Sequence, residues 1–181
     1  MTGTLLSLGH GYTAAALARR LLPEGWRVIG THRAPETAAT LRAEGVEPLS
    51  WPQTSLAPVL GQASHVLVSI PPGPEGDPVL ARHAADLAAA RPLWVGYLST
   101  TGVYGDHGGG WVDETTPPAP ATARGCARVA AEAEWRATGL PVHIFRLAGI
   151  YGPGRGPFEK LRNGTARRIV KPGQVFSRAH V

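Results

Sequence analysis

The sequence predicts an α/β domain of three layers, in which helices cover both faces of a parallel β-sheet. Short apolar runs alternate along the chain with segments whose apolar residues recur at helical spacing. The runs are almost continuously apolar, as is typical of strands that are buried on both faces. The 181 residues are enough for one domain with a real core and too few for two ordinary domains.

The expected strands and helices follow one another along most of the chain. Pro23 ends the first helical pattern and Pro71 ends the fourth strand, because proline interrupts the hydrogen bonding of either element. A connection over 52–61 has room for one helical turn, and a Gly/Pro-rich loop covers 101–121. The expected strands are Thr4–Leu8, Trp26–Thr31, Val46–Trp51, His65–Ile70, Leu93–Ser99 and Val142–Leu147, and the expected helices are Tyr12–Leu22, Glu36–Ala43, Pro78–Ala90 and Thr122–Thr138.

Composition excludes several classes of protein. Hydrophobic residues make up 43% of the chain and charged residues 17%, which argues against intrinsic disorder. The single cysteine, Cys126, excludes an internal disulfide framework and a cysteine-based zinc site, and the seven histidines show no ligand spacing, so no metal is expected. No apolar run can span a bilayer, and the first residues do not resemble a signal peptide, so a cytoplasmic protein is expected.

The positive charge is concentrated near the end of the sequence. The formal net charge is +5, whereas residues 151–181 hold seven Lys or Arg and one acid, Glu159. Such a segment fits an acidic small molecule or a nucleic acid, or it is a solvated segment that packs against something else. It contains no known nucleic-acid recognition motif, which argues against nucleic acid. A small-molecule substrate is therefore the expected partner, with no membrane contact, and a homodimer is left open.

A glycine-rich turn follows the first strand. Residues 9–14 read G-H-G-Y-T-A, a G-x-G-x-x-A motif between a strand and an amphipathic helix. In this context Gly9 permits a tight turn, Gly11 lets a diphosphate approach the backbone, and Ala14 lets the helix pack close to the sheet. The alternative is a turn that needs glycine for its geometry alone. The residues predicted to bind a dinucleotide here are Gly9, Gly11, Tyr12, Thr13 and Ala14.

The end of the second strand bears on which dinucleotide is bound. An NAD site usually has an acid there, for the ribose 2′-hydroxyl, but this segment reads Gly30-Thr31-His32-Arg33 and has no acid before Glu36. An arginine suits a 2′-phosphate, because it forms bidentate charge-assisted hydrogen bonds. We therefore expect NADP in preference to NAD, with Thr31, His32 and Arg33 beside the cofactor. The alternative is that Arg33 is only an exposed loop residue.

Three segments together resemble a known family. They are 9–14, the S-T-T-G-V-Y-G of 99–105, and the R-L-A-G-I-Y-G-P-G-R of 146–155. This combination resembles the extended short-chain dehydrogenase/reductases, the NAD(P)-dependent epimerase/dehydratase group. The resemblance implies a Rossmann-type doubly wound sheet, with 1–150 as the dinucleotide-binding domain and 151–181 as the start of a substrate-binding region. It also implies that Pro71 and Ser99 border the cofactor, and that the protein is an oxidoreductase or epimerase acting on a sugar-nucleotide-like or other polar carbonyl or alcohol.

The catalytic residues depart from the family pattern. The resemblance implies that Thr100 bonds the reacting oxygen and that a Tyr and a Lys fall at positions occupied here by Arg124 and Arg128. Arginine stays protonated and cannot act as a general base, although Arg128 could still bond a ribose or phosphate. Tyr104 is the nearest alternative acid/base, ahead of Tyr151 and His107. These departures indicate an atypical branch of the family, and they leave open a non-catalytic NAD(P) sensor or scaffold.

The end of the sequence also differs from the family pattern. Family members continue past the segment that resembles 176–181 with most of a substrate-binding subdomain, whereas this sequence ends at Val181. We therefore expect a chain truncated at its C-terminus, with that subdomain largely missing and the substrate pocket incomplete. Among the five tryptophans, Trp111 is expected to be the most exposed, because it lies in the Gly/Pro-rich loop.

Overall fold

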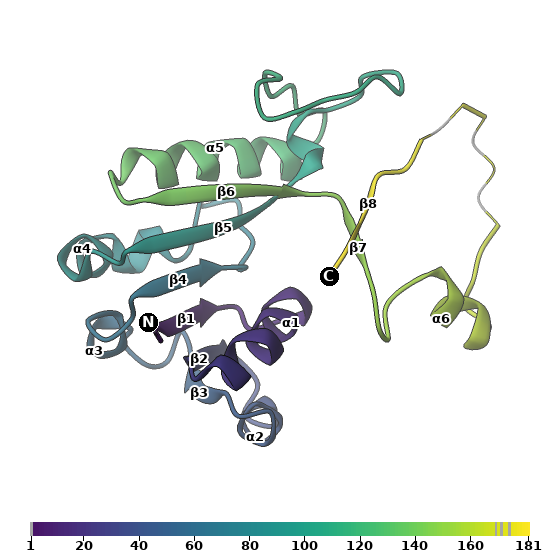
Figure 1. Cartoon of the computed structure of the whole chain (residues 1–181). Helices are drawn as coiled ribbons and strands as arrows, with labels where there is room; N and C mark the ends of the chain where they lie inside the picture. The colour runs from purple at the N-terminus through teal and green to yellow at the C-terminus, as the bar shows by residue number, and fades with distance from the viewer. Residues whose placement is uncertain (1, 169, 171, 174) are drawn as a thin grey trace.

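The computed structural model describes residues 2–168, 170, 172–173 and 175–181, and it contains the predicted parallel sheet with helices on both faces (Figure 1). The strand order is β3-β2-β1-β4-β5-β6, with every neighbouring pair parallel. The chain moves outward in opposite directions from β1 and β4, so the switch point of this Rossmann-type sheet lies between them. The strands are β1 (Thr4–Leu8), β2 (Arg27–His32), β3 (Glu47–Ser50), β4 (His65–Val68), β5 (Trp94–Thr100) and β6 (Val142–Leu147).

The helices form two layers, one on each face of the sheet. On one face, Ala14 and Ala18 pack against Leu5 and Val28 in one buried cluster, and small side chains at these positions let the first helix lie close to the strands. On the other face, Leu60 and the later helices bury a larger cluster. The helices are α1 (Tyr12–Leu21), α2 (Thr37–Ala43), α3 (Ala57–Leu60), α4 (Leu80–Ala90) and α5 (Ala123–Ala137), with the 3₁₀ helices η1 (Leu22–Glu24) and η2 (Thr101–Val103).

The α4–α5 face has a polar link inside its core. The indole of Trp135, which is fully buried on α5, donates a hydrogen bond to Asp77 Oδ2 at 2.9 Å. Asp77 Oδ1 accepts from the backbone N–H groups of Val79 and Leu80, so this carboxylate also begins α4. A buried carboxylate is tolerated here because each oxygen has a donor.

The predicted elements are confirmed with small shifts at their ends. The fourth strand stops at Val68 instead of Ile70, two residues earlier than expected. The predicted alanine-rich helix is α5, and Thr122 is its N-cap, with Thr122 Oγ1 accepting from the N–H of Gly125 at 3.1 Å. The loop expected over 101–121 begins with η2, which Thr100 caps in the same way.

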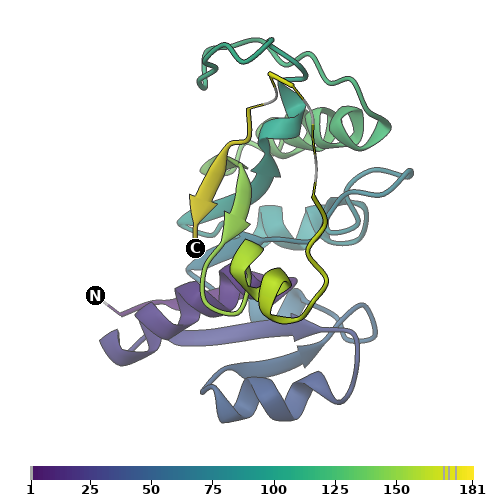
Figure 2. The same ribbon diagram turned by 90° about the vertical axis from the view of Figure 1, so that its right-hand side faces the viewer.

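The last part of the chain lies beyond the carboxyl ends of β5 and β6, apart from the main sheet (Figures 1 and 2). It contains β7 (Gly149–Tyr151), α6 (Pro157–Arg162) and β8 (Arg178–His180), and β7 pairs with β8 in a second, parallel sheet. Within the described residues, none of the helices has the length and apolar character needed to cross a membrane.

Candidate functional site

The glycine turn after β1 has a conformation that requires glycine at its first position. Gly9 has φ +82°, and a Cβ built there would lie 2.8 Å from Ile70 Cγ1. The N–H of Gly9 donates to Thr31 Oγ1 at 2.7 Å, and this hydroxyl in turn donates to the carbonyl of Ser7 at 3.3 Å. The turn is therefore held against the ends of β2 and β4.

The second glycine leaves open space in front of the first helix. Gly11 is the N-cap of α1, and a Cβ built on it would meet only the carbonyl of Gly9, at 3.9 Å. No side chain caps the helix, and its first turn contains no acid. The N–H groups at the start of an α-helix have no partner inside it, so those of 12–14 can donate to an outside acceptor.

A cavity of about 450 Å³ lies beside this turn, and we call it the glycine-loop cavity. Its lining comes from the turn, from the ends of β4, β5 and β6, from the start of α5, and from the segment after β6. It collects most of the predicted site residues, namely Gly9, Gly11, Tyr12, Thr13, Ala14, Ser99, Thr100 and Arg128.

Four of the residues predicted to bind the cofactor do not line this cavity. Thr31 is buried and braces the glycine turn through its hydroxyl, a role that the sequence did not reveal. His32 and Arg33 lie at and just after the carboxyl end of β2, where Arg33 is exposed. Pro71 is exposed just past the end of β4. These residues therefore lie at the same edge of the sheet as the turn, at the ends of the two strands that flank β1.

All the charged residues that line the glycine-loop cavity are arginines: Arg124, Arg128 and Arg155. Within the described ranges, none of the three has a carboxylate oxygen within 4.0 Å. Arg128 is only 7% exposed. Its Nη1 donates to the carbonyl of Leu98 at 2.7 Å and to Tyr97 Oη at 3.2 Å, and its Nε has no hydrogen-bond partner in the described part of the chain.

A buried cation without a carboxylate partner is costly. Removing a charge from water has a large penalty that a nearby opposite charge normally offsets. Tyr97 does not supply that charge, because burial raises its pKa to about 12, although the charge of Arg128 acts in the opposite direction. The arrangement is therefore that of a site prepared for an anionic ligand.

Ser69, Arg124 and Arg155 are among the lining residues of this cavity that sequence reasoning missed. Ser69 follows β4 directly, and its buried Oγ has no hydrogen-bond partner in the described ranges. Ser69 lies beside the glycine turn, because Val68, the residue before it, pairs with Leu8, the last residue before the turn. The family resemblance gives Arg124 only the position of a missing tyrosine, and it gives Arg155 no role within the third motif.

A buried network lies behind the end of β5. Ser99 Oγ donates to Glu132 Oε1 at 2.5 Å, and Arg146 Nη2 lies 2.8 Å from Glu132 Oε2. Arg146 Nη1 donates to Tyr104 Oη at 3.1 Å. Glu132 is 1% exposed, and its contact raises the pKa of Arg146 further above its ordinary value. The network joins α5, β5, β6 and the predicted acid/base Tyr104.

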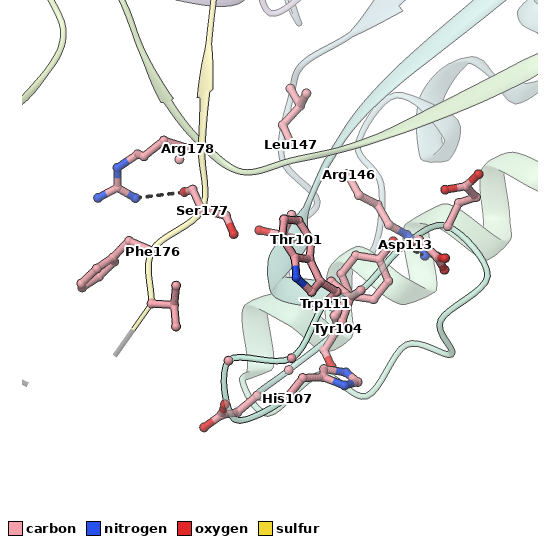
Figure 3. A pocket seen from close by; sticks show the side chains of 18 of the residues that line it. Thr101, Tyr104, His107, Trp111, Asp113, Arg146, Leu147, Phe176, Ser177 and Arg178 are labelled. Atoms are coloured by element: carbon pink, nitrogen blue, oxygen red, sulfur yellow. Dashed lines mark hydrogen bonds between the residues drawn. The ribbon is translucent and has the colours of Figure 1, made fainter. Parts of the chain in front are cut away.

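A second cavity, which we call the outer cavity, has a volume of about 1030 Å³. Figure 3 shows it between the loop that carries Tyr104, His107 and Trp111 and the segment that carries Phe176 and Arg178. Trp111 is fully exposed, as predicted. Tyr104 is buried among the lining residues, beneath the guanidinium of Arg146.

The two cavities share part of their lining. Thr101, Leu147 and Gly149 border both of them. Thr100 pairs with Leu147 across β5 and β6, so the second and third sequence motifs end side by side at this boundary. Thr100 Oγ1 accepts from the N–H of Gly102 at 3.2 Å, which leaves its hydroxyl hydrogen free to donate. A molecule in the outer cavity would thus lie next to one in the glycine-loop cavity.

The described residues contain no group of three or more His, Cys, Asp and Glu side chains that could hold a metal ion. The fold and the cavities define the class of the protein, a Rossmann-type α/β protein with a cationic cleft at the switch point of its sheet.

Comparisons with known proteins agree with this class. No protein-family model matches the chain. The chain is 32% identical over 175 residues to Protein YeeZ of Escherichia coli K12, covering 88% of this chain and 63% of YeeZ. A solved structure of a conserved protein of unknown function from Silicibacter pomeroyi is 60% identical, with a TM-score of 0.93, and covers 99% of this chain and 64% of that one.

A more distant solved structure shares the fold alone. It is the UDP-glucuronic acid 4-epimerase of Bacillus cereus, in complex with UDP-4-deoxy-4-fluoro-glucuronic acid and NAD. The identity is 19% and the TM-score 0.76, with 98% of this chain and 69% of the epimerase covered. This chain spans less than two thirds of the length of YeeZ and of the Silicibacter protein.

Proposed function

We propose that the protein binds a nicotinamide dinucleotide in the glycine-loop cavity, with its diphosphate at the start of α1. The observation that carries this proposal is the lining of the cavity, which combines three arginines and no acid with the uncapped amino end of α1. The distant epimerase that shares the fold is described with NAD. The E. coli and Silicibacter proteins have names that state no ligand.

The residues of the cavity fit such a ligand. The open space in front of Gly11 admits a diphosphate to within reach of the backbone N–H groups of α1. The diphosphate would be the negatively charged partner that Arg128 does not find among the described residues, and the buried hydroxyl of Ser69 would gain a hydrogen-bond partner.

We further propose a preference for NADP(H) over NAD(H). Arg33 is exposed just after the carboxyl end of β2, and the chain has no acid between β2 and Glu36. In this type of fold, the adenosine ribose lies at that position. The guanidinium would form charge-assisted hydrogen bonds with a 2′-phosphate, whereas it would gain little from a 2′-hydroxyl.

The proposed activity is that of an atypical member of the epimerase/dehydratase group, an oxidoreductase or epimerase acting on a sugar-nucleotide-like or other polar carbonyl or alcohol. Bound nicotinamide would supply or accept a hydride at the substrate carbon. Thr100 would donate a hydrogen bond to the substrate oxygen, and Tyr104 would exchange the proton with that oxygen. Arg146, which donates to Tyr104 Oη, would hold the phenol in position for this exchange.

The outer cavity is the proposed substrate site. It borders the glycine-loop cavity at Thr101, and its lining combines the aromatic faces of Trp111 and Phe176 with the guanidinium of Arg178 (Figure 3). Aromatic faces stack on planar rings, and a guanidinium binds phosphate. A substrate with a base and a phosphate fits these groups.

A non-catalytic NAD(P) sensor or scaffold is the second candidate. One observation favours it: Arg124 and Arg128 occupy the positions where the family resemblance implies a Tyr and a Lys, and arginine cannot act as a general base. Such a protein would bind the same dinucleotide in the same cavity and show no turnover.

Two measurements test the proposal. Titration calorimetry with NADP(H) and NAD(H) should show saturable binding that is tighter for NADP(H), and the absence of binding at millimolar concentrations would overturn the proposal. Oxidation of NADPH is then followed with a panel of carbonyl compounds, including nucleotide sugars. Turnover that Thr100→Ala and Tyr104→Phe reduce by about 100-fold each supports the enzyme. Binding without turnover supports the sensor, and turnover unchanged in both variants would contradict the assigned roles.

A further inference from the structure

The segment after β7 is attached to the glycine turn through one side chain. Tyr12, the first residue of α1, donates a hydrogen bond from its Oη to the carbonyl of Pro153 at 3.0 Å. The guanidinium carbon of Arg155 lies 5.2 Å from the centroid of the Tyr12 ring. A Cβ built on Gly152 would lie within 2.5 Å of Tyr12 Oη, so this backbone is in close contact with the tyrosine.

The turn that presents Arg155 has a defined geometry. The N–H of Gly152 donates to the carbonyl of Arg155 at 2.8 Å, and the N–H of Arg155 donates back at 2.9 Å. Pro153 and Gly154 stand between them, and Gly154 has φ +70°, which a turn with proline second and glycine third requires. The two hydrogen bonds of the turn therefore fix the backbone position from which the Arg155 side chain extends. The ring of Tyr12 supports its guanidinium.

The charge of Arg155 is available to a ligand. Its side chain lines the glycine-loop cavity, and no carboxylate oxygen of the described residues lies within 4.0 Å of it. Arg128 gives an independent indication of an anion in the same cavity, because it is nine-tenths buried with its Nε unpartnered among the described residues. Arg155, Arg128 and the amino end of α1 thus border one space of about 450 Å³.

We infer that Arg155 and Tyr12 form a clamp over the diphosphate of the bound dinucleotide. Tyr12 holds the 152–155 turn against the start of α1, and Arg155 donates to the phosphate oxygens together with the N–H groups of the helix. Arg155 is then a cofactor-binding residue and Tyr12 a positioning residue. This inference rests on the proposed function, since it names how that ligand is held.

The clamp predicts that substitutions of Arg155 and of Arg33 change the Kd values for the two dinucleotides differently. The diphosphate is common to both dinucleotides, so Arg155→Gln should raise the Kd for NADP(H) and for NAD(H) by the same factor, about 10-fold or more for a lost charge-assisted bond. Tyr12→Ala, which removes the support of Arg155 and the bond to Pro153, should raise both values in the same direction. Tyr12→Phe keeps the ring and should have a smaller effect than Tyr12→Ala.

The experiment is titration calorimetry on the full chain, with Arg167→Gln as the matched control. Arg167 is exposed and does not line the cavity. Its substitution by Gln removes the same charge from the same part of the sequence. The control should keep both Kd values within about twofold of the original. Circular dichroism checks that each variant is folded.

The outcomes distinguish the clamp from the proposed function. If the original protein binds dinucleotide and Arg155→Gln binds it equally tightly, the clamp is wrong and the proposed function stands. If Arg155→Gln weakens NADP(H) alone, Arg155 contacts the 2′-phosphate and the clamp over the diphosphate is also wrong. If the original protein binds no dinucleotide, both inferences are overturned.

Discussion

The guanidinium of Arg146 lies over the ring of Tyr104, with its carbon 4.9 Å from the ring centroid, and also donates a hydrogen bond to the tyrosine hydroxyl at 3.1 Å. The same guanidinium pairs with the buried carboxylate of Glu132, which accepts from Ser99 on its other side. The side chain of Tyr104 is thus oriented by a network that reaches from β6 through α5 to the end of β5.

Removing the carboxylate of this network should destabilise the fold. In Glu132→Ala, Arg146 loses its charged partner in a largely buried setting, and the hydroxyl of Ser99 loses its acceptor. Breaking a buried ion pair in this way costs about 3–5 kcal/mol. Urea denaturation followed by tryptophan fluorescence measures the change in unfolding free energy.

The control for this variant is an ion pair on the surface. Arg27 and Glu47 lie 2.6 Å apart across β2 and β3, and both side chains are exposed to solvent. Glu47→Ala should cost less than about 1 kcal/mol, because water screens this pair. Equal losses in the two variants would contradict the structural role given to Glu132.

The two glycines of the turn should respond differently to the same substitution. Gly9→Ala places a Cβ at φ +82° and in collision with Ile70, so it should lower the unfolding free energy by about 1–2 kcal/mol or more. Gly11→Ala meets open space and should leave stability nearly unchanged, while its methyl group occupies the approach of the diphosphate. Thermal denaturation and dinucleotide titration of both variants test this, and full binding by a stable Gly11→Ala protein would contradict the proposed site.

Arg33 should determine the choice between the two dinucleotides. Arg33→Ala should raise the Kd for NADP(H) by about 10- to 100-fold, the value of charge-assisted hydrogen bonds to a phosphate, and change the Kd for NAD(H) only slightly. Calorimetry with both ligands measures the ratio. Arg20→Ala, an exposed arginine on α1 outside the cavity lining, is a charge-matched control. If the ratio of the two Kd values stays unchanged in Arg33→Ala, this arginine does not bind the 2′-phosphate.

His10, between the two glycines, should make stability depend on pH. Its ring packs against Gly30, and neither ring nitrogen has a hydrogen-bond partner in the described part of the chain. Burial lowers the pKa of His10 below its ordinary value of 6.5, with the charge of Arg19 acting in the same direction and that of Glu44 opposing it.

The sign of the effect follows from the lowered pKa. Well above pH 6.5 the ring is neutral in both states, whereas around and below pH 6.5 the unfolded chain binds a proton that the folded chain resists. The unfolding free energy should therefore fall as the pH decreases from about 6.5 towards the folded-state pKa. Burial also lowers the pKa of His65, which adds to the same slope. Urea denaturation between pH 8 and 5.5 should show a shallower slope for His10→Phe, and an identical slope would overturn the assignment.

Much of this architecture was predictable, because local patterns carry it. The alternation of strands and helices, the glycine turn and the alanine-rich helix expected over 122–138 depend on neighbours in the sequence. The short strand pair β7–β8 was not predicted, because it joins three-residue segments that are 29 positions apart, with Gly149 opposite Arg178. Strands that short carry no periodic signal of their own.

The sequence by itself determined the fold class, the position of the glycine turn and the arginine after β2, since each depends on residue types at short spacing. Only the tertiary structure decided that Ser69, Arg128 and Arg155 line one cavity, that Thr31 braces the turn, and that Glu132 joins Ser99 to Arg146. These contacts depend on strand order and register, which bring the carboxyl ends of β1, β4, β5 and β6 to one edge. Register reflects the packing of the whole sheet, and no local segment encodes it.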